Sequence, residues 1–364
     1  MSRMLKLFTC LILSCGCLCF AQKTSQYRLI RHLGFSTDNI AGSDGGDSLG
    51  ANSVLSAARG TTPGPDLGLF PKLSSASSVG STGGGSPEQI LAGVVDIHAH
   101  CDPDSVPRSI DAIDLARLAR DRGMRGLVLK NHFDPTASMA YLVRKEVPGI
   151  QVFGGIVLNR TVGGINPAAV EHLVAVKGGW GRVVWMPTED AENQVRYSKK
   201  NRPFVPVARN GELLPEVKEV LKILAQHRLV LATGHSSPAE DLMLIRAAKS
   251  AGVQNIVVTH PMSPPVKMSL DEMKQAAALG AYLEFTYSGA IAPEEPSNFH
   301  DYANAIRAVG IEHCILSSDL GQPRNPLHPD GWLTFFQELR AQGFSQQQID
   351  QMSKVNPAKL LNLP

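Results

Sequence analysis

The sequence predicts an α/β protein folded as a (β/α)8 barrel. From Val94 onward, short apolar runs alternate with amphipathic helical patterns, and eight such strand–helix units fit the length that a barrel needs. Histidines follow the first, second, fifth and sixth apolar runs. In a barrel these strand ends meet on one face, whereas a doubly wound open sheet, the alternative architecture, does not readily explain their placement.

The expected strands are short runs of mainly apolar residues. Continuous apolar character is typical of parallel strands that are covered on both faces. In chain order the expected strands are Val94–Ile97, Gly126–Leu129, Gln151–Val157, Arg182–Met186, Leu229–Ala232, Asn255–Val258, Ala281–Phe285 and Cys314–Ser317. Parallel strands need a crossover connection, which is usually a helix.

Helical patterns occupy the intervals between these runs. One apolar face is formed by Ile110, Ile113, Leu115, Leu118 and Ala119, and a second by Val217, Val220, Leu221 and Leu224. Ser237 with Glu240, and Ser269 with Glu272, match the capping box that starts a helix. Glycines suited to a left-handed cap follow five predicted helices, at Gly123, Gly252, Gly280, Gly310 and Gly343.

Residues 1–21 have the pattern of a secretory signal peptide. Arg3 and Lys6 form a basic start, an apolar stretch runs from Leu7 to Phe20, and Ala21 ends a small-residue cleavage site. The pattern predicts an exported protein, either secreted or periplasmic. No later segment approaches the roughly 18 apolar residues of a membrane-spanning helix, so no span is expected in the mature chain.

The segment 22–89 lacks the periodic patterns of helices and strands. It contains three stretches rich in glycine, serine and proline, at 42–50, 61–68 and 74–87. Such a composition cannot bury enough apolar surface to offset the chain entropy lost on folding. We therefore expect a mostly disordered linker, followed by the folded domain at 90–364.

Cysteine usage and charge exclude several classes of protein. Only Cys101 and Cys314 remain after the signal, so the mature chain has no disulfide framework; a lipid anchor at Cys15 or Cys17 is an alternative to release. The signal contains two basic residues and no acidic residue, and its loss takes the formal net charge from +2 to about zero. Such a balance argues against nucleic acid or an anionic membrane as partner.

The pattern Asp96-Ile97-His98-Ala99-His100 is the most informative one for function. Side chains at i and i+2 of a strand point to the same side, and two neutral imidazoles can bind one divalent ion. Further metal-ligating residue types end later strands, namely Lys130 and His132, then His235, then His260, then Asp319. Together these residues predict a metal site at the carboxyl ends of the strands.

This ordered set resembles the amidohydrolase superfamily of metal-dependent barrels. Those proteins carry His-x-His on strand one, histidines after strands five and six, and an aspartate after strand eight. The resemblance covers about residues 90–364, including the ending Asn356-Pro357-Ala358-Lys359-Leu360-Leu361. It implies a metal-dependent hydrolase with His98, His100, Lys130, His235, His260 and Asp319 as the residues that bind the metal, and with one or two divalent ions, zinc being the expected one.

One position departs from that pattern. Two-metal members usually carry a bridging lysine or glutamate at the end of strand four, where this chain has Trp185-Met186-Pro187-Thr188. Lys130, at the end of strand two, leaves three interpretations open: a carbamylated bridge between metals, a charged lysine that binds an anionic substrate, or a lysine that extends outward from the rim. Glu189 and Asp190 are alternative carboxylate ligands.

The expected chemistry is hydrolysis of an amide, ester or lactone bond in a small, anionic or neutral substrate. Asp319 is the expected general base toward a metal-activated water, and His260 the expected residue that polarises the substrate. Alternatives are a phosphoester hydrolase, a metal-dependent decarboxylase or deaminase, and a binding protein without catalysis.

Substrate contacts and assembly are less well defined by the sequence. His132, Asn159, Arg108 and Tyr287 follow strands on the expected catalytic face and are candidate substrate contacts. The long basic segment from Thr188 to Pro215 is a candidate cover over the site. The partner expected is a small molecule, and a homodimer is one option for the assembly.

Overall fold

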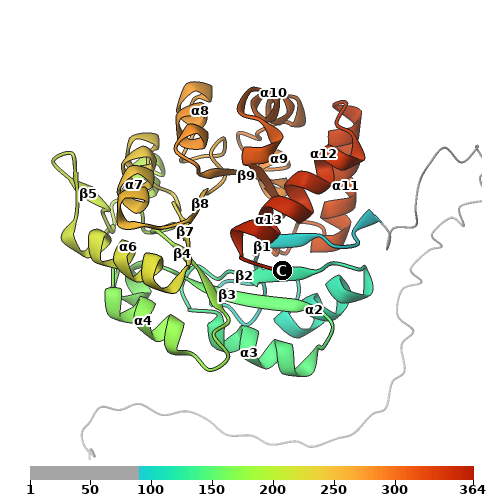
Figure 1. The fold of residues 1–364 in the computed structure, drawn as a ribbon, viewed down its shortest axis with the longest axis horizontal. Helices are drawn as coiled ribbons and strands as arrows, with labels where there is room; N and C mark the ends of the chain where they lie inside the picture. Colours follow the sequence, from blue (N-terminus) through green and yellow to red (C-terminus); the bar gives the residue numbers. More distant parts are fainter. Residues whose placement is uncertain (1–89) are drawn as a thin grey trace, which may run out of the picture. The chain divides into compact units, whose positions relative to one another are not determined.

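The computed structural model of the protein describes residues 90–364. The predicted signal peptide, 1–21, and the predicted linker, 22–89, lie outside the described residues. Within 90–364, eight parallel strands form one sheet that curls into a ring, and helices surround it (Figure 1). No helix in this range is both long and apolar enough to cross a membrane.

All eight predicted strands are present, and the prediction of a (β/α)8 barrel is confirmed. The sheet order is β1-β2-β3-β4-β7-β8-β9-β10, so each strand pairs with the next one of the barrel along the chain. The strands are β1 (Val95–Ala99), β2 (Gly126–Leu129), β3 (Gln151–Val157), β4 (Gly181–Trp185), β7 (Val230–Ala232), β8 (Asn255–Val258), β9 (Tyr282–Thr286) and β10 (Cys314–Ser317).

Helices connect the strands and close the chain. The outer layer consists of α2 (Ala112–Asp121), α3 (Ala137–Glu146), α4 (Pro167–Ala175), α6 (Pro215–His227), α7 (Pro238–Ala251), α8 (Leu270–Ala278), α10 (Phe299–Val309), α11 (His328–Ala341) and α12 (Gln346–Asp350). The last helix, α13 (Asn356–Leu360), packs against β1 and β10. Shorter elements lie in the loops: η1 (Arg160–Val162), α5 (Glu192–Tyr197), the hairpin β5 (Ala208–Arg209) with β6 (Glu212–Leu213), α9 (Tyr287–Ala290), η2 (Ile311–His313) and η3 (Gln351–Val355).

The local signals in the sequence produce the helix boundaries that they predict. Ser237 and Ser269 each begin a helix with a complete capping box. The five glycines expected at helix ends all have positive φ, between 79° for Gly123 and 99° for Gly310, a conformation that costs glycine little. Cys101 and Cys314 are buried free thiols, as expected for a chain without a disulfide framework.

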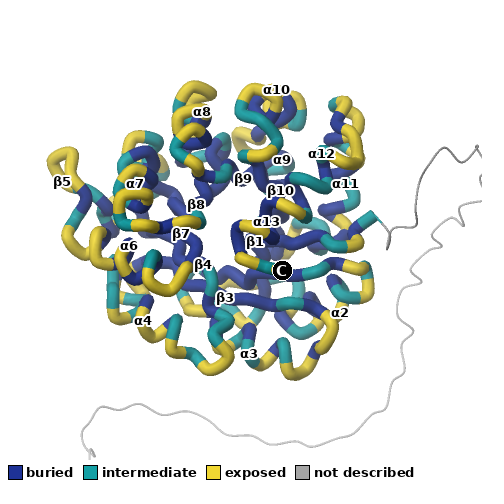
Figure 2. The backbone as a smooth tube through the Cα atoms, viewed as in Figure 1, coloured by how far each residue is buried: buried dark blue, intermediate teal, exposed yellow. Residues whose placement is uncertain are grey.

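The apolar core has two layers. A small inner cluster fills the barrel with alternate side chains of the strands, including Val95, Ile97, Phe153 and Trp185. A larger cluster lies between the strands and the surrounding helices. Figure 2 shows the consequence: the strands are buried and the outward surfaces of the helices are exposed. Burial on both faces explains why the strands are continuously apolar in sequence.

The register of β1 shifts around His98, the first residue of the histidine pair. Val95 and Ile97 belong to the inner cluster, while Ala99 packs on the helix side. The pairing with β2 slips between Asp96 and Ala99, as in a β-bulge. One extra residue resets the alternation, so that His98 follows Ile97 toward the barrel axis and His100 joins it.

Asp96 closes the barrel between its first and last strands. Its Oδ1 accepts hydrogen bonds from the backbone N–H of His98 and of Ser318, both at 3.1 Å, and its Oδ2 accepts one from Trp332 Nε1 at 3.0 Å. Two backbone bonds complete the seam, from Asp319 N to His98 O at 2.8 Å and from His100 N to Leu320 O at 2.9 Å. The buried carboxylate therefore holds the metal-ligand candidates of both strands in register.

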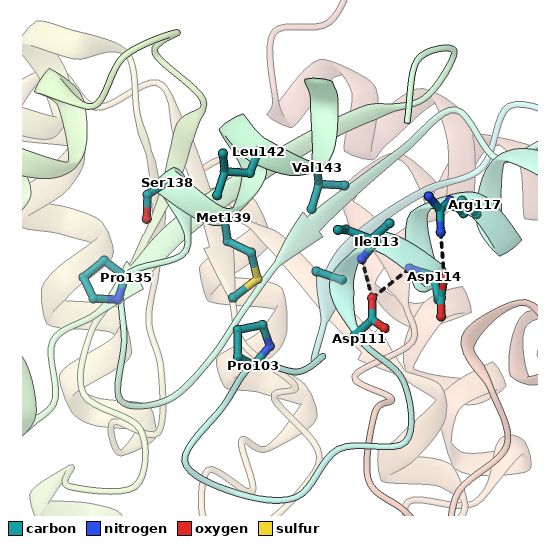
Figure 3. Close-up of a pocket in the computed structure, with 11 residues that line it drawn as sticks. Pro103, Asp111, Ile113, Asp114, Arg117, Pro135, Ser138, Met139, Leu142 and Val143 are labelled. Atoms are coloured by element: carbon teal, nitrogen blue, oxygen red, sulfur yellow. Dashed lines mark hydrogen bonds and ion pairs between the residues drawn. The ribbon is translucent and has the colours of Figure 1, made fainter. Parts of the chain in front are cut away.

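A groove of about 650 Å³ lies on the outer layer between α2 and α3 (Figure 3). Its apolar lining includes Ile113, Met139 and Leu142, and Asp111 and Arg117 lie along it. None of the predicted site residues lines this groove. The groove is therefore separate from the site that the sequence predicts at the carboxyl ends of the strands.

Gly154→Ala is expected to destabilise the barrel. A Cβ atom at Gly154 would lie 2.4 Å from the carbonyl of Thr136, where the start of α3 meets β3. Because backbone atoms cannot easily yield, we expect a loss of about 2 kcal/mol in the free energy of unfolding, measured by urea denaturation. Gly126→Ala is the matched control, since its nearest contact is 3.0 Å away; equal effects in both variants would contradict the explanation.

Candidate metal centre

The structure brings the six predicted metal-binding residues to one end of the barrel. His98 lies at the middle of the group: its Nε2 is 2.9 Å from Lys130 Nζ and 3.0 Å from Asp319 Oδ1. The His98 ring centroid is 5.1 Å from that of His100 and 6.2 Å from that of His260. His235 stands 5.0 Å from His260 by the same measure.

His98, His100 and Asp319 form the tightest part of the group. One potential ligand atom from each residue lies within 4.8 Å of the other two. His100 Nε2 contacts the same oxygen, Asp319 Oδ1, at 3.1 Å. The prediction that the His-x-His pair faces one side is therefore consistent with the geometry, and a cation could contact all three side chains.

Lys130 is directed inward. It follows Val128, which faces the barrel interior, by two residues, and it is 1% exposed. Its Nζ lies 5.5 Å from the ring centre of Trp185. Burial lowers the pKa of Lys130 to about 8, although the carboxylates of Asp319 and Glu284 oppose this shift. The interpretation of Lys130 as a lysine extending outward from the rim is wrong, because its ammonium group does not reach solvent.

His235 and His260 follow β7 and β8. His235 Nδ1 lies 2.8 Å from Gln194 Oε1 of α5, and Asn193 Nδ2 donates to the His235 carbonyl at 3.2 Å. His260 has a φ of 27° and Asp319 a φ of 49°, both in a region that non-glycine residues rarely adopt. Such backbone strain is typical of functional sites, where the surrounding structure maintains it.

The ends of β7 and β8 are tied together by a reciprocal pair of threonines. The backbone N–H of Gly234 donates to Thr259 Oγ1 at 3.1 Å, and the N–H of Thr259 donates to Thr233 Oγ1 at 3.3 Å. Thr259 immediately precedes His260, and Thr233 lies two residues before His235. The two histidines are therefore held at a fixed separation.

Glu284 is a site residue that the sequence analysis missed. It lies on β9, is 2% exposed, and its Oε1 is 3.2 Å from His98 Nδ1. Ser317 Oγ donates to Oε1 at 2.6 Å, and the His260 N–H donates to Oε2 at 3.3 Å. A carboxylate of this kind orients a metal-binding histidine. The available signal was one acidic residue within an otherwise apolar strand.

Asp319 is kept ionised by its surroundings. Burial acts to raise its pKa, but the charge of His98 and the hydrogen bond from His100 outweigh burial and hold the pKa well below its ordinary value. Ser288 Oγ donates to Asp319 Oδ2 at 2.7 Å, so one oxygen is fixed by a hydroxyl while the other faces the histidines. Ser288 was also missed, because a serine after a strand carries no specific signal.

His132 lies beside this group. Its ring centroid is 4.9 Å from that of His100 and 6.3 Å from that of His235. Its Nδ1 contacts Thr188 Oγ1 at 2.8 Å. Asn159 does not face the cluster directly: its amide bridges Thr188, Asp190 and the His132 carbonyl, so it holds the loop that supports His132.

The other substrate candidates have partners outside the cluster. Arg108 forms an ion pair with Asp104, with Nη2 at 2.6 Å from Oδ2. The Tyr287 ring packs against Phe299 and Phe335 at 6.2 and 5.7 Å between centroids, in the helical layer. These contacts identify a packing role for Tyr287.

The basic segment that the sequence marked as a cover contains α5 and the β5–β6 hairpin. Arg202 pairs with Asp190, whose Oδ2 also accepts from Arg160 N at 2.9 Å, so this carboxylate organises the loop. Arg196 pairs with Glu192 at 2.5 Å. The helix was missed because charged residues mask its short apolar pattern, and Gln194, which contacts His235, was missed with it.

The donor set fits a divalent cation. Burial lowers the pKa of His100, His235 and His260 below the ordinary value, so these rings are neutral, as metal ligands must be. The Nδ1 atoms of His100 and His260 are buried and have no hydrogen-bond partner among the described residues. Buried polar atoms without partners are costly, and a bound cation would satisfy atoms of this kind.

Comparison with known proteins gives the family. A protein-family model described as "Family of unknown function (DUF6282)" matches residues 93–284, more than half of the chain. The chain belongs to the DUF6282 family. The part that matches this DUF6282 model includes His98, Lys130, His235 and His260, while Asp319 lies beyond it. A search of curated proteins gives no match for this DUF6282 chain.

Solved structures with the same fold confirm the barrel of this DUF6282 chain. An amidohydrolase from Pseudomonas aeruginosa has a TM-score of 0.53 at 13% identity, over 76% of this chain and 98% of its own. The phosphotriesterase homology protein from Escherichia coli has 0.51 at 17%, over 74% and 98%. An organophosphorus hydrolase variant from Deinococcus radiodurans has 0.51 at 14%, over 75% and 94%. At these identities the similarity shows the fold alone. It confirms the barrel that the resemblance to the amidohydrolase superfamily implied.

Lys130→Met is expected to stabilise the metal-free protein at neutral pH. Burial outweighs the attraction of Asp319 and Glu284 and lowers the pKa of Lys130 to about 8, so the ammonium is less favourable in the folded protein than in the unfolded chain. We expect the free energy of unfolding in a chelating buffer at pH 7 to rise by about 2 kcal/mol, and this gain to shrink as the pH rises above 8. Lys218→Met, on the exposed face of α6, is the control; a Lys130 variant no more stable than this control would contradict the expectation.

Proposed function

We propose that this protein is a metal-dependent hydrolase that cleaves an amide, ester or lactone bond of a small molecule. One observation carries the proposal: His98, His100, Lys130, His235, His260 and Asp319 converge, largely buried, at the carboxyl ends of the barrel strands. In barrels of this type, that end carries the active site. A purely structural role gives no reason for assembling so many costly buried groups.

The residues that would hold the metal are His98 in β1, the histidines that follow β1, β7 and β8, and Asp319. His98 is pre-oriented for this task, because Glu284 accepts from its Nδ1 and its Nε2 is directed toward Lys130 and Asp319. When bound, a divalent cation supplies positive charge that makes a nearby water more acidic and polarises the oxygen of the bond to be cleaved. Zinc is the ion that we propose, because imidazole and carboxylate suit it.

Asp319 acts as the general base. Its depressed pKa keeps it ionised and able to take a proton at neutral pH, and Ser288 fixes its orientation. The same carboxyl group then returns the proton to the leaving atom. In a site that holds a single cation through His98, His100, His235 and Asp319, His260, which lies next to His98 and His235, would instead face the substrate and polarise it.

Lys130 is the proposed bridge between two cations. Its pKa of about 8 leaves an appreciable fraction of neutral amine near neutral pH, and the amine nitrogen can attack carbon dioxide. The new C–N bond gives a carbamate, and the proton that nitrogen loses goes to solvent. A carbamate is an anion with two oxygens, so it would provide the ligand that β4 does not supply. A charged Lys130 that binds an anionic substrate is the remaining alternative.

Phosphoester hydrolysis is the second candidate for the same site. The structures of similar fold include one titled a phosphotriesterase homology protein with phosphate in its active site, and others titled organophosphorus hydrolases. We rank carboxylic ester, amide or lactone cleavage first, in line with the resemblance drawn from the sequence. An exported location and a small-molecule substrate remain parts of this proposal.

Metal content tests the proposal directly. We expect two equivalents of zinc per chain by elemental analysis of protein prepared with bicarbonate, falling to one or none in Lys130→Ala, because the bridge is lost. Lys222→Ala, on the exposed surface of α6, should keep two. One ion in all variants would favour a mononuclear site with Lys130 bound to substrate, and no ion in any of them would exclude the hydrolase.

Asp319→Asn is expected to abolish most activity while the fold persists. A general base contributes about 10²- to 10⁴-fold to rate, so we expect kcat on chromogenic aryl esters and lactones to fall by about 10³-fold. The control is Asp330→Asn, an exposed carboxylate of α11. A variant at Asp319 that retains wild-type kcat would contradict the role assigned to this residue.

A further inference from the structure

His132 is connected to a chain of hydrogen bonds in which each proton can be assigned. Asn159 Oδ1 accepts from two backbone N–H groups, those of Thr188 at 2.9 Å and Asp190 at 3.1 Å. Backbone nitrogens are obligate donors, so this contact fixes which end of the amide is oxygen. The other end, Asn159 Nδ2, then donates to Thr188 Oγ1 at 3.0 Å and to the His132 carbonyl at 2.9 Å.

The hydroxyl proton of Thr188 has one destination. Thr188 is completely buried, and its Oγ1 contacts Asn159 Nδ2, which is a donor, and His132 Nδ1 at 2.8 Å. The hydroxyl therefore accepts from Asn159 and donates to His132 Nδ1. A proton on Nδ1 would leave the buried hydroxyl hydrogen without an acceptor, at the cost of an unsatisfied polar group. His132 is thus the tautomer with its proton on Nε2.

The same assignment of donors and acceptors places a proton on Nδ1 in two neighbouring histidines. Nδ1 of His98 faces the carboxylate of Glu284, and Nδ1 of His235 faces Gln194 Oε1 at 2.8 Å. These oxygens accept, so both rings carry a proton on Nδ1. Nε2 is then the ring atom that each would offer to a cation, and in His98 this atom faces Lys130 Nζ at 2.9 Å and Asp319 Oδ1 at 3.0 Å. His132 instead presents an N–H group on the edge turned away from Thr188. Three histidines in one cluster therefore have two different chemical roles.

We propose that His132 is a catalytic residue that donates a hydrogen bond from Nε2 to an oxygen of the substrate, and that it is not a metal ligand. The inference rests on the proposed hydrolase function, and it specifies a substrate whose reacting group has an oxygen that gains negative charge. The ring stacks on His100 and stands edge-on to His235, which places it beside the ligands. A hydrogen-bond donor held in this way stabilises the transition state most, because the donor does not have to reorient as negative charge develops on the substrate oxygen.

Nuclear magnetic resonance tests the tautomers without any activity measurement. The full chain, labelled with ¹⁵N-histidine, is recorded metal-free and loaded with ¹¹³Cd. We expect His132 to show a protonated Nε2 and no cadmium coupling, while His98 and His235 couple to cadmium through Nε2. Thr188→Val should release the His132 tautomer and Thr188→Ser should preserve it. A proton on Nδ1 of His132, or a cadmium coupling to it, would overturn the inference.

Substitutions separate donation from metal binding. We expect His132→Leu to keep wild-type cadmium and zinc content and to lower kcat by about 10²-fold with little change in KM, because the donor acts on developing charge. His132→Gln retains an N–H donor and should recover part of kcat. Loss of metal in His132→Leu, or an unchanged kcat, would contradict the inference.

The proposed function and the inference fail separately. If the wild-type chain binds no metal, the hydrolase proposal fails, yet the spectrum of the metal-free protein still decides the tautomer of His132. If metal binds and Asp319→Asn is inactive while His132 carries its proton on Nδ1, the inference alone fails.

Discussion

The seam between β1 and β10 is the constraint on which the site depends. A barrel closes when its first and last strands adopt a defined register, and here a buried carboxylate, Asp96, sets that register by accepting from both strands and from Trp332. The same seam places His98 beside Asp319, although these residues are far apart in sequence. Closure of the fold and assembly of the cluster are thus one event, because the bonds that complete the ring also set the distances within the cluster.

A second feature unites the cluster: its charges balance only as a group. His98 contacts a lysine, an aspartate and a glutamate, and each of these would be costly to bury alone. The positively charged groups that face these carboxylates are His98 and the ammonium of Lys130. The proposed carbamylation of Lys130 would turn its ammonium into an anion. An anion at this position suits a site that binds divalent cations.

Much of this arrangement could be predicted from the sequence, for identifiable reasons. Strand positions follow from short apolar runs, and the metal-binding candidates follow from histidines and Asp319 placed after such runs, as at His235 and His260. Glu284 could not be found in this way, since one acid in an apolar strand does not show which histidine it will face. Gln194 lies in a helix that charged residues obscure, and Thr188 acquires its role only through Asn159. Residues whose function consists in orienting another side chain leave little trace in a single sequence.

The contact between α5 and His235 has a consequence for how such barrels diversify. Gln194 and Asn193 lie in a segment inserted between β4 and α6, outside the repeating strand–helix units, yet they fix the ring and the backbone of a ligand candidate. Inserted segments change in length and composition far more easily than barrel strands. Ion preference in this architecture can therefore drift through an insertion while every coordinating side chain stays the same, so two barrels with identical ligands need not select the same ion.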